Sequence, residues 1–137
     1  MNDQNQLGLV QQVYSNFKNG DINALLTQMS EDIEWELPQI ENVPFAGKRQ
    51  GKEMVHNFFT TLLSGQDPLE FNPKEFITQG DKVVTLGHYE WKTKDGNQFG
   101  SEFAHVFTVR DGLVTRFQEY MDTESVAKAY KKSTIAL

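Results

Sequence analysis

The segment FAHVFTVRDGLVTRFQEYMD, residues 103–122, constrains the fold of this chain more than any other stretch. Apolar residues alternate with polar ones on both sides of Arg110-Asp111-Gly112, a pattern typical of two antiparallel strands joined by a turn. A three-residue loop with Gly112 in the left-handed conformation fits this sequence. We therefore predict a β-hairpin with one apolar face.

The length of the loop sets which residues of the hairpin face each other. With a three-residue loop, His105 lies opposite Phe117 and Phe103 lies opposite Glu119. His105 and Glu119 are then diagonal neighbours on the aromatic face of the hairpin. A two-residue loop pairs Ala104 with Glu119 instead, and it separates the imidazole from the carboxylate. On the first register we predict a titratable pair among apolar side chains, which is a common setting for functional groups.

Three segments in the first half of the chain carry apolar residues at helical spacing. Asp21 is placed to cap the second of these segments, and Thr123 is placed to cap a fourth, short helix near the C-terminal end. The first predicted helix carries an apolar stripe from Leu9 to Phe17 and stops at Asn19-Gly20, and the others run from Ile22 to about Ser30, from Lys52 to Gly65 and from Thr123 to Tyr130.

Period-two alternation predicts strands in three places outside the hairpin. These strands cover residues 33–37, a stretch through Phe71 and Phe76, and residues 83–94. Gly87 is expected to mark a bulge or a point of curvature, and residues 39–50 are expected to form a loop that carries Phe45. Helices packed on one face of a curved antiparallel meander indicate an α+β fold.

The size and charge of the chain limit its partners. We expect one domain over residues 1–137, which buries about two thirds of the surface of its unfolded form. A net charge of −6 argues against nucleic acid and acidic membranes as partners. The absence of cysteine excludes disulfides and thiolate sites. No basic and apolar leader and no run of ~18 apolar residues is visible, so we expect a cytoplasmic protein.

His88 and Glu90 form a second candidate cluster on one predicted strand. They share one face of this strand, and Tyr89 and Trp91 take the other. If the strand pairs with the one that carries His105, two histidines and two carboxylates would converge, which suits acid–base chemistry. The alternative is that His88 and Glu90 face water on an open side of the sheet.

The remaining residues bear on cofactors and on self-association. The three histidines have no HExxH or comparable spacing, so we expect no metal and no organic cofactor. His105 has an alternative role as a satisfied core histidine, and Tyr14 and Trp35 are more often core than recognition residues. Tyr89 and Trp91 are expected on the face opposite the pocket, and an apolar patch of this kind predicts a homodimer.

Three features of the chain together resemble the SnoaL-like branch of the nuclear transport factor 2-like superfamily. They are the helix that ends in Asn19-Gly20-Asp21 before DIEWELP, the Phe45-Ala46-Gly47 loop before Gly51-Lys52-Glu53, and VFTVRDGLVTRFQEYMDT. The resemblance implies a strongly bent antiparallel sheet that encloses a pocket with three N-terminal helices, an α+β cone with a short C-terminal helix, usually a dimer. The same fold serves polyketide cyclases, steroid isomerases, epoxide hydrolases and non-enzymatic modules.

Site residues of this family are carried over by position. In SnoaL-type cyclases a carboxylate on the last strand is the acid/base and a histidine fourteen residues earlier is its partner, and these places resemble Glu119 and His105. Limonene epoxide hydrolase needs an arginine near His88, and this chain has none there. Steroid isomerases have their base at the position of Leu37, so the resemblance argues against their mechanism.

We favour a pocket protein that acts on, or holds, a small and mostly apolar molecule, with Glu119 as the acid/base and His105 as its partner. For an enzyme, the resemblance implies cofactor-free proton transfer next to a carbonyl, of isomerase or cyclase type. One rival is a non-catalytic ligand-binding or dimerisation module on the same fold, and another is a structural domain whose cavity is too small for a ligand. The residues expected at the pocket are Tyr14, Trp35, Phe59, His88, Glu90, Phe103 and Phe117.

Overall fold

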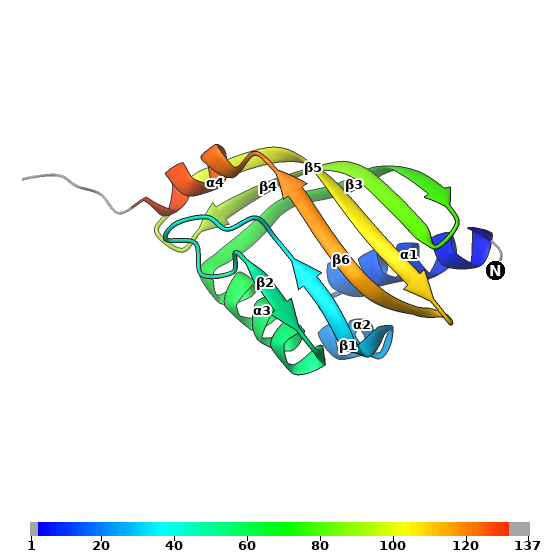
Figure 1. Ribbon diagram of the computed structural model, residues 1–137. Coiled ribbons are helices and arrows are strands. Elements are labelled where there is room, and N and C mark those ends of the chain that lie inside the picture. The colour runs from blue at the N-terminus through cyan, green and yellow to red at the C-terminus, as the bar shows by residue number, and fades with distance from the viewer. Residues whose placement is uncertain (1–2, 132–137) are drawn as a thin grey trace, which may run out of the picture.

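The computed structural model describes residues 3–131, and in that range four helices pack on a six-stranded sheet (Figure 1). The helices are α1 (Asp3–Lys18), α2 (Ile22–Thr27), α3 (Lys52–Gly65) and α4 (Thr123–Tyr130). The strands are β1 (Met29–Glu36), β2 (Lys48–Gln50), β3 (Gln66–Gln79), β4 (Lys82–Thr93), β5 (Gln98–Arg110) and β6 (Leu113–Met121). They follow the order β2-β1-β6-β5-β4-β3, in which β1 and β6 are parallel and the other neighbours are antiparallel.

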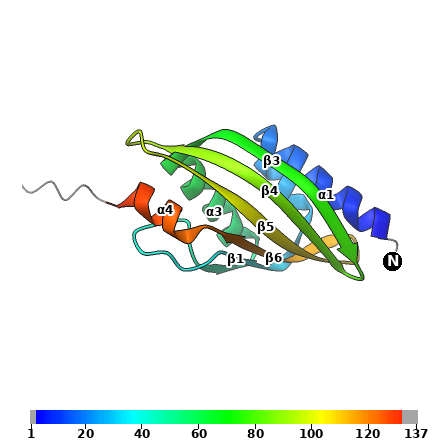
Figure 2. The same cartoon turned by 90° about the horizontal axis from the view of Figure 1, so that it is seen from above.

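The sheet bends strongly, and α1, α2 and α3 lie along its concave side (Figure 1). Figure 2 shows α4 on the opposite side of the view from α1, at the end of the sheet where the β6 strand leads into it. The α+β class and the bent sheet with its helices are thus confirmed. Because the helices cover only the concave side, the core and any enclosed space lie between the two layers.

Two helix boundaries differ from their predictions. Asp21 caps α2 as predicted, because its carboxylate accepts a hydrogen bond from the backbone N–H of Ala24 at 3.1 Å. α2 ends at Thr27, earlier than predicted, since the buried Met29 already belongs to β1. The cap of α4 is Asp122, which accepts hydrogen bonds from the first backbone N–H groups of the helix, so the assignment of the cap to Thr123 was wrong.

A short strand and an irregular pair complete the sheet. The three residues of β2 pair with β1 inside the predicted loop of residues 39–50, and a strand of this length has no detectable period. Pro73 pairs with Gly87, and β3 then carries an extra residue before the next pair. A Cβ atom on Gly87 would lie 2.5 Å from the Cζ atom of Phe103, so only glycine leaves room for this ring. The irregularity predicted at Gly87 is confirmed, with the extra residue on β3.

The core is built mainly of aromatic rings from both layers. The indole of Trp35 on β1 stacks on the ring of Phe117 on β6, with the ring centroids 3.9 Å apart. Phe59 of α3 lies edge-on to the same indole at 5.5 Å. Burying one large side chain such as that of Phe107 contributes ~1.5–3 kcal/mol, so these contacts hold the helices firmly against the sheet.

The loop of the β5–β6 hairpin is shorter than predicted. Asp111 and Gly112 have φ angles of 53° and 76° and form a two-residue loop that pairs Arg110 with Leu113. Such a loop needs positive φ at both of its residues, which an Asp-Gly pair supplies. The predicted three-residue loop is therefore wrong. If this register continued along the hairpin, the imidazole and the carboxylate of the candidate pair would lie on opposite faces.

A β-bulge at Thr115 restores the common face. The pairs on either side of Thr115 are Val109 with Val114 and Thr108 with Arg116, so Thr115 is an extra residue in β6. Beyond the bulge His105 pairs directly with Glu119, rather than diagonally as predicted. Both side chains therefore lie on the concave face, as expected, but for a different reason.

Deletion of Thr115 removes the extra residue from the bulge. The two-residue loop then dictates a register in which Phe117 and Glu119 move to the convex face. Because at least one large side chain loses its burial, we expect the free energy of unfolding to fall by ~1.5–3 kcal/mol or more in urea denaturation. Thr115→Ala keeps the residue count and should cost ~1 kcal/mol or less. Equal stability of the two variants would contradict the register.

Candidate functional site

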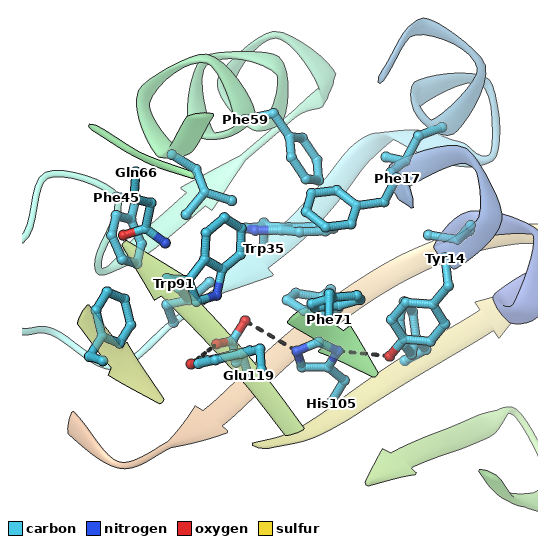
Figure 3. A pocket seen from close by; sticks show the side chains of 18 residues that line it. Tyr14, Phe17, Trp35, Phe45, Phe59, Gln66, Phe71, Trp91, His105 and Glu119 are labelled. Atoms are coloured by element: carbon cyan, nitrogen blue, oxygen red, sulfur yellow. Dashed lines mark hydrogen bonds and ion pairs between the residues drawn. The ribbon is translucent and has the colours of Figure 1, made fainter. Parts of the chain in front are cut away.

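The bent sheet and the helices enclose a cavity of about 60 Å³ (Figure 3). Most of its walls are apolar, and many of them are rings: Phe17, Trp35, Phe45, Phe59, Phe71, Trp91, Phe99, Phe107 and Phe117. The polar side chains at the cavity are Tyr14, Gln66, Tyr89, His105 and Glu119. A few convergent polar groups within apolar walls are typical of a site for a small molecule.

His105 and Glu119 lie at the centre of a hydrogen-bonded chain in this cavity. The Nε2 atom of His105 is 3.2 Å from Oε1 of Glu119, and its Nδ1 atom is 2.7 Å from the hydroxyl of Tyr14 (Figure 3). The Tyr89 hydroxyl donates to Oε2 of Glu119 at 3.0 Å. The His105 side chain is 4% exposed and that of Glu119 is 12% exposed. Four elements, α1, β4, β5 and β6, thus supply one buried polar network.

The two tyrosines of this network keep their protons at neutral pH. Burial, together with the nearby charge of Glu119, raises the pKa of both Tyr14 and Tyr89 well above the usual 10.0. A carboxylate at Glu119 can only accept, so its contact with His105 places a ring hydrogen on Nε2, and the Tyr14 hydroxyl can then donate to Nδ1. Each carboxylate oxygen can accept two hydrogen bonds, so Glu119 retains acceptor capacity for a ligand.

The second candidate cluster lies outside the cavity. Thr85 is the β4 residue that faces His105, and His88 and Glu90 lie on the opposite, convex face of the sheet. The predicted convergence of two histidines and two carboxylates is therefore wrong, although the two strands pair. His88 is hydrogen-bonded to Glu90 and lies close to Glu102, and the bond to Glu90 raises the pKa of His88.

Tyr89 and Trp91 point inward, against their predicted exposure. They are 4% and 3% exposed and line the cavity, because the face of β4 that carries Thr85 is the concave one. The assignment of these two rings to an outer patch was wrong. Tyr89 was missed as a site residue, and the signal that would have found it is its shared face with Thr85, the partner of His105. Gln66 and Phe71 were also missed, because the extent of their strand was uncertain.

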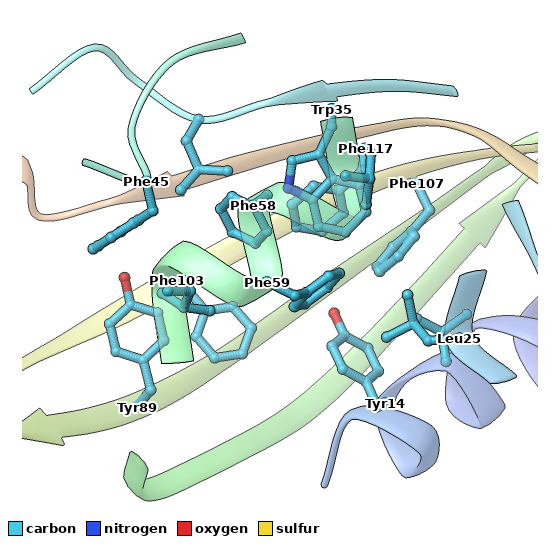
Figure 4. Packing of buried hydrophobic residues seen from close by; sticks show 14 of the residues in the cluster. Tyr14, Leu25, Trp35, Phe45, Phe58, Phe59, Tyr89, Phe103, Phe107 and Phe117 are labelled. Carbon is cyan, nitrogen blue, oxygen red and sulfur yellow. The ribbon is translucent and has the colours of Figure 1, made fainter. Parts of the chain in front are cut away.

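The other predicted pocket residues fall into two groups (Figure 4). Those that line the cavity are Tyr14, Trp35, Phe59 and Phe117. Phe103 lies behind the cavity wall, where its ring stacks on His105 at 4.2 Å and on Tyr89 at 5.3 Å between centroids. Phe103 therefore fixes the orientation of two members of the network without lining the cavity itself.

Phe17 of α1 and Phe71 of β3 lie between the cavity and the surface. Their ring centroids are 5.0 Å apart. Both rings line the cavity and also an outer hollow of about 390 Å³ formed with Leu63, Pro68 and neighbouring residues. A molecule that reaches Glu119 from this hollow has to displace one of the two rings.

Two features are absent from the described part of the chain, a metal-binding cluster and a membrane-spanning helix. Between residues 3 and 131, no group of three or more His, Asp or Glu side chains is arranged to hold a metal ion. Among the helices of the described part of the chain, none has the length and hydropathy needed to cross a membrane.

The fold places the protein in the nuclear transport factor 2-like (NTF2-like) class. An NTF2-like protein from Burkholderia xenovorans LB400 is 28% identical with a TM-score of 0.87, over 96% of this chain and 99% of that one. TerC, which was crystallised with polyporic acid, is 28% identical with a TM-score of 0.81, over 93% and 99%. A candidate polyketide cyclase from Xanthomonas campestris pv. campestris shares the fold at 21% identity and a TM-score of 0.79, over 96% and 100%.

The family model of the SnoaL-like domain matches residues 10–117, and the chain belongs to this family. The resemblance recognised in the sequence is thereby confirmed. The match ends at Phe117, so the position of Glu119 in the site rests on the hairpin register and its contacts. No curated protein matches the chain in sequence.

The two buried tyrosines predict how stability depends on pH. The folded-state pKa values of Tyr14 and Tyr89 lie well above 10.0, the ordinary value. Their contribution to stability is therefore complete below pH ~10 and is lost as the pH rises further, because the unfolded chain then binds fewer protons than the folded one. Each tyrosine lowers the free energy of unfolding by up to ~1.4 kcal/mol per pH unit in that range.

Urea denaturation between pH ~9 and ~11 measures this effect, since the unfolded-state value lies within that interval. Replacing both Tyr14 and Tyr89 by Phe should flatten the decline in stability above pH ~10. Tyr120→Phe serves as a matched control, because this tyrosine is 51% exposed. A decline of the same slope in the double variant would contradict the assignment of buried, protonated hydroxyls.

Proposed function

We propose that this protein catalyses proton transfer next to a carbonyl group of a small, largely apolar molecule. Glu119 is the acid/base and His105 is its partner, and no cofactor takes part. The observation that carries this proposal is the placement of a carboxylate, held by two donors, at the wall of an aromatic cavity. The fold is compatible with it, since the class includes proteins described as polyketide cyclases.

The network prepares Glu119 for this role in two ways. The hydrogen bonds from His105 and Tyr89 fix the plane of the carboxylate, so that little reorganisation is needed when a proton moves. The apolar walls exclude water, which strengthens electrostatic interactions between Glu119 and a bound carbonyl compound.

The size of the cavity bears on the choice between this proposal and its rivals. Ligand pockets commonly enclose ~300–1,000 Å³, and the cavity holds about 60 Å³. A substrate therefore needs the cavity to widen, and the rings of Phe17 and Phe71, which also line the outer hollow, can move apart to allow this. The small volume favours, as a second candidate, the structural domain whose cavity is too small for a ligand, in which His105 is a satisfied core histidine. The similarity to TerC instead supports a pocket that binds a ligand, because TerC was crystallised with polyporic acid.

Exchange of α-hydrogens in 2-tetralone tests the catalytic proposal. The ketone is dissolved in deuterium oxide with the protein, and proton NMR follows the loss of the signals next to the carbonyl. We expect the wild-type protein to accelerate exchange over buffer, and Glu119→Gln to reduce the acceleration ~100-fold or more while the shape of the side chain is kept. Glu102→Gln on the convex face is the matched control and should accelerate the exchange as much as the wild type does.

The same experiment separates the catalytic proposal from its non-catalytic rivals. Raised thermal stability with 2-tetralone, without any acceleration of exchange, would favour the non-catalytic ligand-binding module. Acceleration that survives Glu119→Gln would overturn the role of Glu119 and leave the acid/base to another group.

We also propose that the protein is a homodimer whose interface is the convex face of the sheet. Ile77 and Tyr120 are 54% and 51% exposed there, and the register places Val84, Leu86 and Val106 between them. An apolar patch of this kind is uncommon on a monomer. These residues therefore support the homodimer that was predicted from Tyr89 and Trp91. The cytoplasmic location stays a prediction.

Sedimentation of the wild-type protein and of Tyr120→Lys tests the dimer. We expect a dimer for the wild type at micromolar concentration and a larger share of monomer for the variant, because the lysine places a charge in an apolar interface. Lys92→Ala, on an exposed part of the same face, is the control. A wild-type species of 15.7 kDa, the mass of one chain, would contradict the proposal.

A further inference from the structure

Gln66 places a polar group in the cavity away from the His105–Glu119 pair. This residue begins β3, is 1% exposed, and lies opposite Thr93 at the end of β4. Thr93 comes four residues after Tyr89, whose hydroxyl contacts Glu119, and four residues of strand span ~13 Å. Figure 3 shows Trp91 between Gln66 and Glu119. The cavity thus has polar groups at two ends and an aromatic wall between them.

The carboxamide of Gln66 is held in one orientation by α4. Its Oε1 atom accepts a hydrogen bond from the Tyr130 hydroxyl at 2.5 Å. Burial raises the pKa of Tyr130 to about 12, so the hydroxyl stays protonated and donates. The Tyr130 ring is itself packed edge-on against Phe45 at 5.7 Å and Phe99 at 6.4 Å. A Cβ atom on Gly65 would lie 3.3 Å from the Tyr130 hydroxyl, so glycine leaves space for this contact.

This orientation turns the amide nitrogen of Gln66 toward the cavity. In Figure 3 the nitrogen lies on the side of Trp91 and the oxygen points away from it. Within residues 3–131 the Nε2 atom donates no hydrogen bond, although the side chain is almost fully buried and lines the cavity. Within residues 3–131, Nε2 is not among the fully buried polar atoms that lack a partner, so it borders the space of the cavity, and anchoring Tyr130 requires only the oxygen. A purely structural role therefore leaves half of this side chain unexplained.

We propose that Gln66 is a second binding subsite, which donates a hydrogen bond to an acceptor oxygen of the ligand at the end remote from the reacting carbon. The inference rests on the proposed function and narrows it. The ligand is a flat conjugated molecule of about two rings that carries one oxygen near Glu119 and another near Gln66. Trp91 and Phe99 contact the body between these ends, and Tyr130 is a positioning residue that holds the carboxamide.

Two probes that differ by one remote formyl group, which carries the acceptor oxygen, test the subsite. They are 2-naphthol and 6-hydroxy-2-naphthaldehyde, whose affinities are measured by isothermal titration calorimetry. A hydrogen bond to a buried donor is worth roughly a 3- to 10-fold change in affinity, so the wild type should bind the aldehyde tighter than 2-naphthol by about that factor. Gln66→Leu should abolish this preference and leave the affinity for 2-naphthol within about twofold, since only one contact is lost.

Tyr130→Phe provides the second variant. It keeps the amide of Gln66 but frees its orientation, so the preference for the aldehyde should fall to an intermediate value. Proton–nitrogen NMR gives a direct readout in the wild type: the side-chain amide signals of Gln66 should shift downfield with the aldehyde and much less with 2-naphthol.

The outcomes separate the subsite from the proposed function. If both probes bind but the aldehyde preference is absent, or survives Gln66→Leu, the subsite is overturned while the ligand pocket stands. If the aldehyde does not shift the side-chain amide signals of Gln66, the subsite is likewise overturned while the ligand pocket stands. If neither probe binds to the wild type, the ligand pocket and the subsite both fail.

Discussion

The extra residue at Thr115 determines which side chains of β6 face the cavity. The side chains of a strand alternate between two faces, so a shift of one residue would exchange Phe117 and Glu119 for their neighbours. Asp111-Gly112 alone dictates the wrong register for the site, and the bulge corrects it. The stacking of Phe117 on Trp35 and the contact of Glu119 with His105 both follow from this local feature.

The buried carboxylate ties the two layers of the fold together. A carboxylate that is 12% exposed among aromatic rings is costly unless donors surround it. His105 and Tyr89 supply those donors, and Tyr14 of α1 completes the chain from the helical layer. The groups that make the burial of Glu119 tolerable are the same groups that orient it for the proton transfer that we propose. Substitutions that keep the shape of the side chains are therefore needed to separate its structural role from its chemical one.

Sequence periodicity was sufficient for the four helices and for most of the strands, whereas the common face of His105 and Glu119 was predicted from a register that the structure corrects. It failed at features that depend on one residue, such as the bulge at Thr115, because alternation on either side of a turn does not reveal an inserted residue. Periodicity also could not tell which face of β4 lies on the concave side of the sheet. Both faces of this strand carry residues suited to a site, and only the pairing of Thr85 with His105 selects the face of Tyr89. Gln66 was missed because the sequence left the start of its strand uncertain, and because its packing against α4 is a long-range contact.

The position of the hydrogen on the His105 ring is the most direct test of the buried network that links Tyr14, His105 and Glu119. Two-bond proton–nitrogen NMR of protein labelled in its histidines distinguishes the two ring nitrogens. We predict for His105 a hydrogen on Nε2 and an acceptor at Nδ1, with a shift of the Nδ1 resonance alone in Tyr14→Phe. The exposed His56 provides an internal comparison. If the two ring nitrogens of His105 have the same chemical shifts as those of His56, and these shifts do not respond to Tyr14→Phe, the buried network and the site built on it are contradicted.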